Sequence, residues 1–475
     1  MDTEKPPNSQ VSTPVDDDRH SGSVDEAEVF VTGQGGINFR TVGWVRASMF
    51  FTKMTFATGV LAIPAALYVL GAVAGAIFIV FWGAVNTYCA LIQGRFKLKY
   101  PSVHTVPDCA HTAALELGWS KRTALVVREI SEFFYLFTWV LVSGVVILGL
   151  TIALNAVSKH ATCTVTFGFV AYVFVTTLAS IPKIHQLGWI TWAGFISMVT
   201  AVMIVVIAVT LRDRPAAAPQ TGPFDLGFSA IPPMGTTFAA AWSASGAIFA
   251  SSANTSGFVP VISEMRRPQD YHKSVYCCMA WITSSYLAFS LVVYAYCGKW
   301  VSAVALGSAG PTIKIIAYAI AIPGLSAGCV IAIHVAAKSF FVRFLRNTTH
   351  LTHRTKTHWA VWLSCTYGVG AVGWIICEAI PFYGNLTSLV GGVGFGYLGI
   401  CVPAVLWMVL NPGYRTGSLK QSFQWYAHAA LLVVGLFVVI GGAYANIVSI
   451  KAQFDAKAVG SAFSCADNSL TIAGG

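Results

Sequence analysis

Two groups of small polar residues interrupt long apolar runs, and these residue types suit a polar ligand site inside a membrane. The first run, residues 51–69, contains Thr58 and Gly59 ahead of a proline. The second run, residues 238–262, has four such residues ahead of another proline: Ser251, Ser252, Asn254 and Thr255. Backbone leaves a helix at membrane depth only where protein or a water-filled cavity satisfies its free N–H and C=O groups. Paired interrupted helices are the best sequence sign of a transporter's binding site.

Charged residues within apolar runs form the second set of candidate functional residues. A charge at membrane depth is costly, so each such residue is a functional hypothesis by default. Lys53 precedes the first break by more than one helical turn, and Glu129 and Glu132 lie in a later run. A pair between Lys53 and either glutamate predicts a cytoplasmic gate or a proton relay. The alternative is a structural ion pair, such as one between Arg128 and Glu132, which are spaced i,i+4. An unperturbed histidine titrates near neutral pH, which makes His334 a candidate for proton coupling; its alternative role is packing.

The elements that must position these residues are membrane-spanning helices. The 475-residue chain is 56% apolar and only 10% charged. Since a span takes about 20 apolar residues, the sequence predicts about eleven helices. They cover residues 47–69, 72–94, 124–156, 164–182, 187–211, 236–262, 274–297, 311–341, 358–378, 384–409 and 425–450. The predicted fold class is an all-α integral membrane protein with its transmembrane domain at residues 47–450.

The distribution of basic residues predicts the orientation. With the N-terminus in the cytoplasm, most Lys and Arg residues fall in inner loops. The outer loops then hold only Lys159, Arg212, Arg214, Lys299, Lys451 and Lys457. This asymmetry follows the positive-inside rule, and an odd number of spans places the C-terminus outside. The net charge of +10 is mostly cytoplasmic loop charge facing anionic lipid, so a nucleic-acid partner has no support.

The two ends of the chain differ from the apolar domain. Residues 1–46 are predicted to comprise an acidic cytoplasmic tail, disordered because it has too little apolar surface to bury, and a short interfacial entry segment at residues 33–45. The tail is either plainly solvated or regulatory, with Lys5 open to ubiquitin and Ser21 or Ser23 open to a kinase. Residues 451–475 are predicted to form a short extracellular tail.

The eleven cysteines predict no metal site, because none has the spacing of a zinc site. Most lie within spans, where cysteine acts as a small apolar packing residue. Cys163, Cys297 and Cys465 fall on or near the outer face. Two of these three could form a disulfide, and the sequence leaves the pairing open. Asn385 begins a glycosylation sequon, but it lies too near a span to be a good acceptor.

Several segments together resemble the amino acid/auxin permease family. They are FATGVLAIP in the first run, VPVISEMRRP at the end of the second broken run and the glycine-rich SLVGGVGFGYLG. HVAAKSFFVRFLRN and HLTHRTKTHW are similar to the fungal branch of neutral amino acid permeases. The resemblance covers nearly all of residues 35–450. It implies the LeuT-like architecture, in which spans 1–5 and 6–10 form two inverted repeats and an eleventh helix lies outside them.

This resemblance implies that the two breaks bind a zwitterionic amino acid. The half-helix that starts at a break offers N–H groups to the carboxylate, and the half that ends there offers carbonyls to the ammonium group or a cation. The family pattern places the first break at Thr58, Gly59, Val60 and Leu61. The second follows Ser251 at Ser252, Ala253, Asn254 and Thr255, where many members have glycines in place of Ala253 and Asn254. Gly59 has no Cβ, so its backbone can come close to the ligand. The alternative is that these residues only mediate helix packing.

Spans 3 and 8 flank the breaks in this architecture and are expected to set selectivity. Tyr135 and Trp139 lie one turn apart in span 3, and Ser326 lies in the middle of span 8. Aromatic walls favour neutral, apolar or aromatic amino acids. The alternative for either ring is packing against lipid or a neighbouring helix.

The sequence therefore predicts a secondary active transporter that imports neutral amino acids by alternating access, with no enzymatic activity, cofactor or metal. Its partners are the amino acid and the lipid bilayer. The expected coupling ion is H⁺, with Na⁺ as the alternative, and the fungal resemblance favours the plasma membrane over the vacuole. A receptor that senses amino acids without net transport is the rival from another class. A permease for another small amine or acid also remains open.

Overall fold

The structure is a computed structural model that describes residues 42–56, 59–181, 188–346, 348–351, 353, 355–456 and 461–469. These residues form an all-helical protein, and their β-type pairing is limited to a parallel bridge between Val42 and Met265. Residues 1–41, which hold most of the predicted N-terminal segment and all of its ubiquitin and kinase sites, lie outside the described residues. The domain bounds at 46 and 450 stay predictions.

Every predicted apolar run corresponds to a helix or to a group of consecutive helices. The bounds are α1 (Trp44–Phe56) and α2 (Ile63–Leu70), α3 (Ala72–Lys99), α5 (Lys121–Ser158), α6 (Thr164–Ala179), α7 (Gly188–Thr210), α8 (Phe238–Ser252) and α9 (Val259–Glu264), α10 (Tyr271–Cys297), α11 (Pro311–Leu345), α12 (Lys356–Ala379), α13 (Tyr383–Leu389) and α14 (Val402–Leu410), and α15 (Leu419–Asp455). The largest difference between a predicted and an observed bound is six residues, from 425 to Leu419 at the start of α15.

The fold class is confirmed as an all-helical integral membrane protein. Among the described residues, eight helical segments are long and apolar enough to cross a membrane, and the pair α1–α2, bent by 43°, is a ninth candidate. Helix α6 has 16 residues, and α8 and α9 have 15 and 6. These helices fall short of a full span individually. The count of eleven spans and the inverted repeat therefore stay predictions.

One helix, α4 (Val106–Glu116), was not predicted. Its N-terminus carries a capping box, in which Thr105 Oγ1 accepts from the Asp108 N–H and the Asp108 carboxylate accepts from the Thr105 N–H. With only 11 residues, it is too short for the apolar-run rule to detect. It packs against α5, where Arg128 pairs with Asp108 at 3.1 Å.

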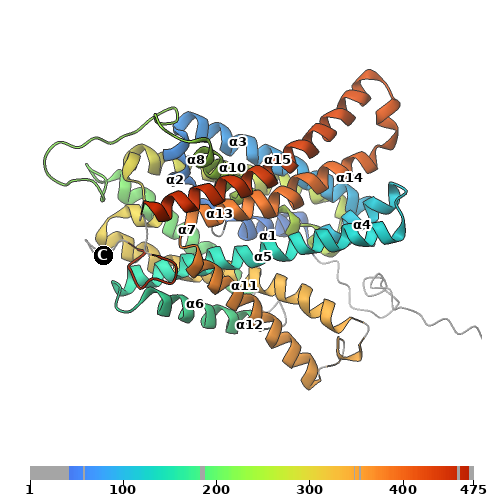
Figure 1. The fold of residues 1–475 in the computed structure, drawn as a ribbon, viewed down its shortest axis with the longest axis horizontal. Helices are drawn as coiled ribbons and strands as arrows, with labels where there is room; N and C mark the ends of the chain where they lie inside the picture. Colours follow the sequence, from blue (N-terminus) through green and yellow to red (C-terminus); the bar gives the residue numbers. More distant parts are fainter. Residues whose placement is uncertain are drawn as a thin grey trace, which may run out of the picture. The chain divides into compact units, whose positions relative to one another are not determined.

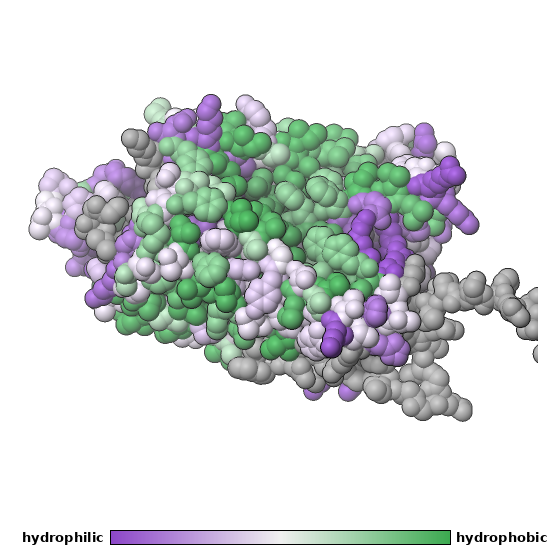
Figure 2. All heavy atoms as spheres, turned by 60° about the horizontal axis from the view of Figure 1, so that its bottom comes forward, coloured by the Kyte–Doolittle hydropathy of each residue, from purple (hydrophilic) through white to green (hydrophobic). Residues whose placement is uncertain are grey.

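The surface has the pattern expected of helices that contact lipid. Large apolar side chains are exposed along the long helices, among them Ile77, Phe133, Val433, Ile440 and Ile447. In Figure 2, hydrophobic residues gather across the middle of the face and hydrophilic residues gather toward its two ends. In Figure 1, the loop between α7 and α8 lies at one end of the long helices, whereas α4 and the α11–α12 and α14–α15 turns lie at the other. The loops thus separate onto two ends as predicted; which end faces the cytoplasm stays a prediction.

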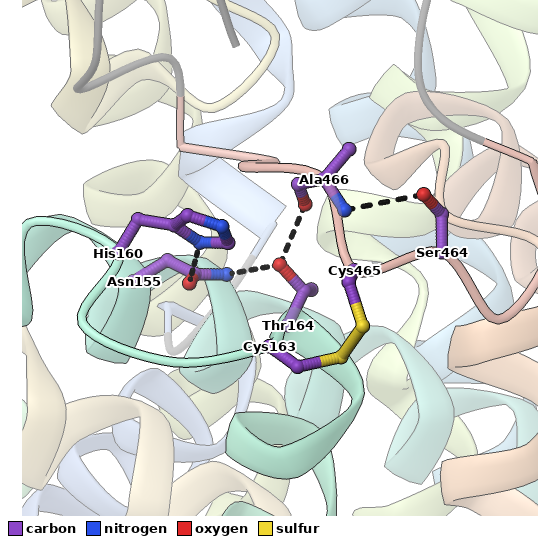
Figure 3. The surroundings of a disulfide bond; sticks show 7 residues. All are labelled: Asn155, His160, Cys163, Thr164, Ser464, Cys465 and Ala466. Carbon is purple, nitrogen blue, oxygen red and sulfur yellow. Dashed lines mark hydrogen bonds between the residues drawn. A yellow bond between two sulfur atoms is a disulfide. The ribbon is translucent and has the colours of Figure 1, made fainter.

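A disulfide joins the α5–α6 loop to the segment after α15 (Figure 3). It links Cys163 to Cys465, whereas Cys297 is a buried free cysteine. Thr164 Oγ1 donates to the Ala466 carbonyl at 2.6 Å and accepts from Asn155 Nδ2 at 2.9 Å. One of the open pairings is therefore confirmed. Predicted spans 4 to 11 separate the two cysteines, and this even number agrees with their lying on one side of the membrane.

Candidate functional site

The two helix breaks lie against each other. Helix α1 is followed by a 3-10 turn at Gly59–Leu61 before α2, and α8 is followed by a 3-10 turn at Asn254–Gly257 before α9. Pro64 and Pro260 lie in the first turns of α2 and α9, where a proline's missing N–H costs no helical hydrogen bond. The interruptions thus fall at the predicted residues, although Thr58 lies outside the described residues.

Side chains of the second break bond to the backbone of the first. The single proton of the Ser251 hydroxyl is shared between the Gly59 carbonyl at 2.9 Å and the Ala247 carbonyl of its own helix at 2.8 Å. Asn254 Nδ2 donates to the Met54 carbonyl at 3.3 Å. A third bond supports the edge of the site, where Asn86 Nδ2 of α3 donates to Ser252 Oγ at 2.8 Å. Hydrogen bonds of this kind satisfy the backbone groups that a broken helix leaves free.

Gly59 is required for this close approach of the two breaks. A Cβ at Gly59 would lie 2.5 Å from Ser251 Cα and 2.6 Å from Ser251 Cβ, far inside the 3.5–4.0 Å of normal carbon–carbon separations. On the other side of the junction, a Cβ at Gly257 would lie 1.9 Å from Met54 Cε. The prediction is that the missing Cβ at Gly59 allows close approach by a ligand. In the structure the closest neighbour is the second break itself.

Several buried polar atoms at this junction have no hydrogen-bond partner among the described residues. They are Thr55 Oγ1, Asn254 Oδ1, Thr255 Oγ1 and Ser256 Oγ. Ser326 Oγ, in the middle of α11, is also buried and unpartnered among the described residues. Most buried polar atoms in proteins are paired, because an unsatisfied one costs about 1–3 kcal/mol. The four unpartnered atoms at the breaks therefore indicate a surface prepared for a polar ligand.

A narrow cavity of about 30 Å³ lies beside the first break. Lys53 and Phe56 of α1, Trp139 of α5, Phe195 of α7 and Asn254 of the second break contribute to its walls. The middle of α11 closes the remaining side with small residues: Gly324, Ala327 and Gly328. The cavity thus has mostly apolar walls, with polar side chains from Lys53, Thr191 and Asn254.

The residues predicted to set selectivity meet this cavity to different degrees. Trp139 lines it directly. Tyr135 is buried one turn earlier and meets the Trp139 ring edge-on, with the ring centroids 6.2 Å apart. Ser326 is buried next to Ala327, which lines the cavity. The structure therefore brings spans 3 and 8 to the first break, with Tyr135 as support behind Trp139.

The predicted charge pairs do not form in this structure. Lys53 Nζ lies 3.7 Å from the centroid of the Trp192 ring of α7, a cation–π contact. Glu129 pairs instead with Arg343 of α11. No ion pair of Glu132 with Lys53 or with Arg128 occurs among the described residues. The pairs do not form because Lys53 points toward α7, whereas the part of α5 around Arg128 and Glu129 faces α4 and α11.

His334 lies away from the cavity. Its buried ring donates from Nδ1 to the Ala179 carbonyl at 3.3 Å and meets the Trp362 ring edge-on at 5.1 Å. These neighbours belong to α6 and α12. The contacts are those expected of the packing role.

Two contributors were missed by the sequence analysis. Helix α7 supplies Thr191, Gly194, Phe195 and Met198 to the cavity walls, yet its sequence reads as a uniformly apolar run. The available signal was Gly194, a glycine between aromatic residues that marks close packing; its Cβ would lie 2.6 Å from Ala327 Cβ of α11. The second is Tyr286 of α10, which contacts both breaks.

Comparison with known proteins gives a consistent result. Residues 40–448 match the family described as transmembrane amino acid transporter protein. A "Transmembrane transporter" of Fusarium pseudograminearum is 40% identical over 453 residues, covering 95% of this chain and 93% of the relative. One of Gibberella moniliformis is 41% identical, covering 93% and 91%. An "N amino acid transport system protein" of Neurospora crassa is 26% identical, covering 97% of both chains.

Proposed function

The chain belongs to the transmembrane amino acid transporter family, and on this premise we propose that it is a secondary active transporter that imports neutral amino acids. The observation that carries the proposal is the junction of two helix breaks with unpartnered polar atoms around it. The name of the Neurospora crassa relative, an amino acid transport system protein, supports the same class of substrate.

The two ends of the zwitterion would be bound by opposite helix ends. The carboxylate would bind at the N-terminal start of α2, where the backbone N–H groups of Gly59, Val60 and Leu61 and the helix dipole favour a negative charge. The ammonium group would bind the hydroxyls of Thr255 and Ser256 and the carbonyls at the end of α8. These hydroxyls are buried and unpartnered among the described residues, so a donor from the ligand would satisfy them.

The cavity walls support a neutral side chain. Trp139, Val142, Val146, Phe195 and Met198 present aromatic or aliphatic surface. Of the described residues that line the cavity, none is acidic and Lys53 is the basic one. A lysine or arginine substrate would therefore meet a like charge without a compensating carboxylate, which disfavours its binding.

The cavity size supports alternating access. A volume of about 30 Å³ is too small for an amino acid, so the helices around it must move to admit one. The walls come from α1 and the turn after α8 on one side and from α5, α7 and α11 on the other, and α7 packs along α11. A relative movement of these groups would open the site to one side at a time.

Proton coupling is the favoured form of energy input, with Na⁺ as the alternative. Lys53 is the best-placed candidate, because it lines the cavity and contacts Trp192 rather than a carboxylate. Glu129, Glu132 and His334 lie farther from the breaks and are retained as secondary candidates for gating or coupling. The Cys163–Cys465 disulfide suits an oxidising compartment, which supports placing this end and the C-terminus outside at the plasma membrane.

Uptake by the purified protein in proteoliposomes tests the proposal. Labelled neutral, basic and acidic amino acids are offered at several pH values, with and without Na⁺. We expect concentrative uptake of neutral amino acids that follows an imposed proton gradient, and weak competition by lysine. Binding of label without any accumulation would favour the receptor, and strong competition by lysine would show that the pocket is wrongly assigned.

A further inference from the structure

One tyrosine of α10 contacts the backbone of both helix breaks. Tyr286 is buried, and its hydroxyl lies 3.1 Å from the Thr55 carbonyl and 3.1 Å from the Ser251 carbonyl. Each carbonyl lies one residue before the end of its helix, Thr55 in α1 and Ser251 in α8. Because the hydroxyl has a single proton, the two carbonyls share one donor.

These carbonyls need a donor because of where they lie. The last carbonyls of a helix have no partner N–H in the helix itself, and they carry the negative end of the helix dipole. Here the C-terminal ends of α1 and α8 converge on one point, so their partial negative charges repel each other in a buried region. A shared hydroxyl proton between them offsets this repulsion and links the two helix ends.

The rest of Tyr286 is held independently of its hydroxyl. Its ring stacks on Phe56 at the end of α1, with centroids 5.8 Å apart and planes at 25°. Helix α10 also packs along α1, where Ser274 Oγ donates to the Trp44 carbonyl at 2.8 Å. Deleting the hydroxyl therefore removes this link between the two helix ends, leaves the bonds from Ser251 and Asn254 across the junction, and leaves the ring in place.

We propose that Tyr286 is a positioning residue, whose hydroxyl holds the ends of α1 and α8 in the arrangement that binds the amino acid. The assignment of a ligand to this junction rests on the proposed function; the link between the two breaks does not. The residue acts through the breaks and lines no part of the cavity described above. Its loss should weaken substrate affinity more than the maximum rate, because the binding groups would no longer be pre-organised.

The test compares Tyr286→Phe with Tyr294→Phe, a matched deletion on the same helix. Tyr294 is also buried, but its hydroxyl bonds to Ser229, accepting from the backbone N–H at 3.1 Å and donating to the carbonyl at 3.4 Å, away from both breaks. For purified wild-type and variant proteins, we measure uptake KM and Vmax, melting temperature without ligand, and backbone hydrogen exchange.

We expect Tyr286→Phe to raise KM at least tenfold with Vmax within threefold of wild type, and to speed hydrogen exchange at residues 59–61 and 254–257 together. Tyr294→Phe should leave KM and both break segments unchanged and speed exchange near Ser229. Unchanged exchange at the breaks in Tyr286→Phe overturns the proposal, as does a KM effect matched by Tyr294→Phe at equal loss of melting temperature. If the wild-type protein takes up no amino acid while exchange still rises at both breaks, the proposed function fails and the positioning role is supported.

Discussion

Replacing Gly59 by alanine should disable the site through a backbone clash. The added Cβ would lie 2.5 Å from Ser251 Cα, 2.6 Å from its Cβ and 2.9 Å from its Oγ. Normal separations between carbon atoms begin near 3.5 Å, so the two breaks must separate by about 1 Å. The closest atom belongs to the backbone, and a change of side-chain rotamer cannot relieve the clash.

The expected cost follows from two physical contributions. Overpacking of this kind costs about 1–3 kcal/mol. Separation of the breaks also lengthens the bond from Ser251 Oγ to the Gly59 carbonyl, worth about 0.5–1.5 kcal/mol. Together they amount to roughly 1.5–4.5 kcal/mol against the assembled junction, at least a tenfold loss of affinity since each ~1.4 kcal/mol is a factor of ten. Gly59→Val adds bulk and should abolish uptake.

Initial uptake of a labelled neutral amino acid, normalised to the protein labelled at the cell surface, measures the effect. Gly368→Ala is the matched control, because a Cβ at that helical glycine of α12 meets no atom within 4 Å. Ser251→Gly should rescue Gly59→Ala only in part, since the backbone at position 251 would still clash with the added methyl group. Wild-type uptake by Gly59→Ala at normal surface level would refute the reasoning and remove the junction as the site.

Three further predictions follow from other parts of the molecule. An impermeant thiol reagent outside the cell should label a cysteine at Ala217, exposed in the α7–α8 loop, and not one at Thr349; the opposite pattern would reverse the predicted orientation. Cys163→Ser, Cys465→Ser and the double variant should each lose the same free energy of unfolding, about 2–4 kcal/mol, when unfolding is followed without reductant. A double variant less stable than either single variant would mean that the cysteines act separately. Lys53→Met should abolish uptake driven by a proton gradient while exchange of label across the membrane continues, and intact gradient-driven uptake would remove Lys53 from the coupling.

The helices and their breaks were predictable because the signals are local. A run of apolar residues long enough for the membrane predicts a span wherever it occurs, and small polar residues ahead of a proline predict an interruption. Both kinds of signal depend on neighbours in sequence alone. Helix α4 escaped because it is short and amphipathic, although its capping box at Thr105 and Asp108 was visible in the sequence.

The tertiary structure alone decided which residues meet. Sequence patterns ranked Glu129 and Glu132 as partners of Lys53, but packing placed Lys53 over Trp192 of α7. The same packing selected Cys465 as the partner of Cys163 from the pairings left open. It also turned Gly59 toward Ser251 and brought Tyr286 to the ends of both broken helices. These contacts join residues far apart in the chain, and they depend on how the helices rotate and pack against one another, which hydropathy and local spacing do not encode.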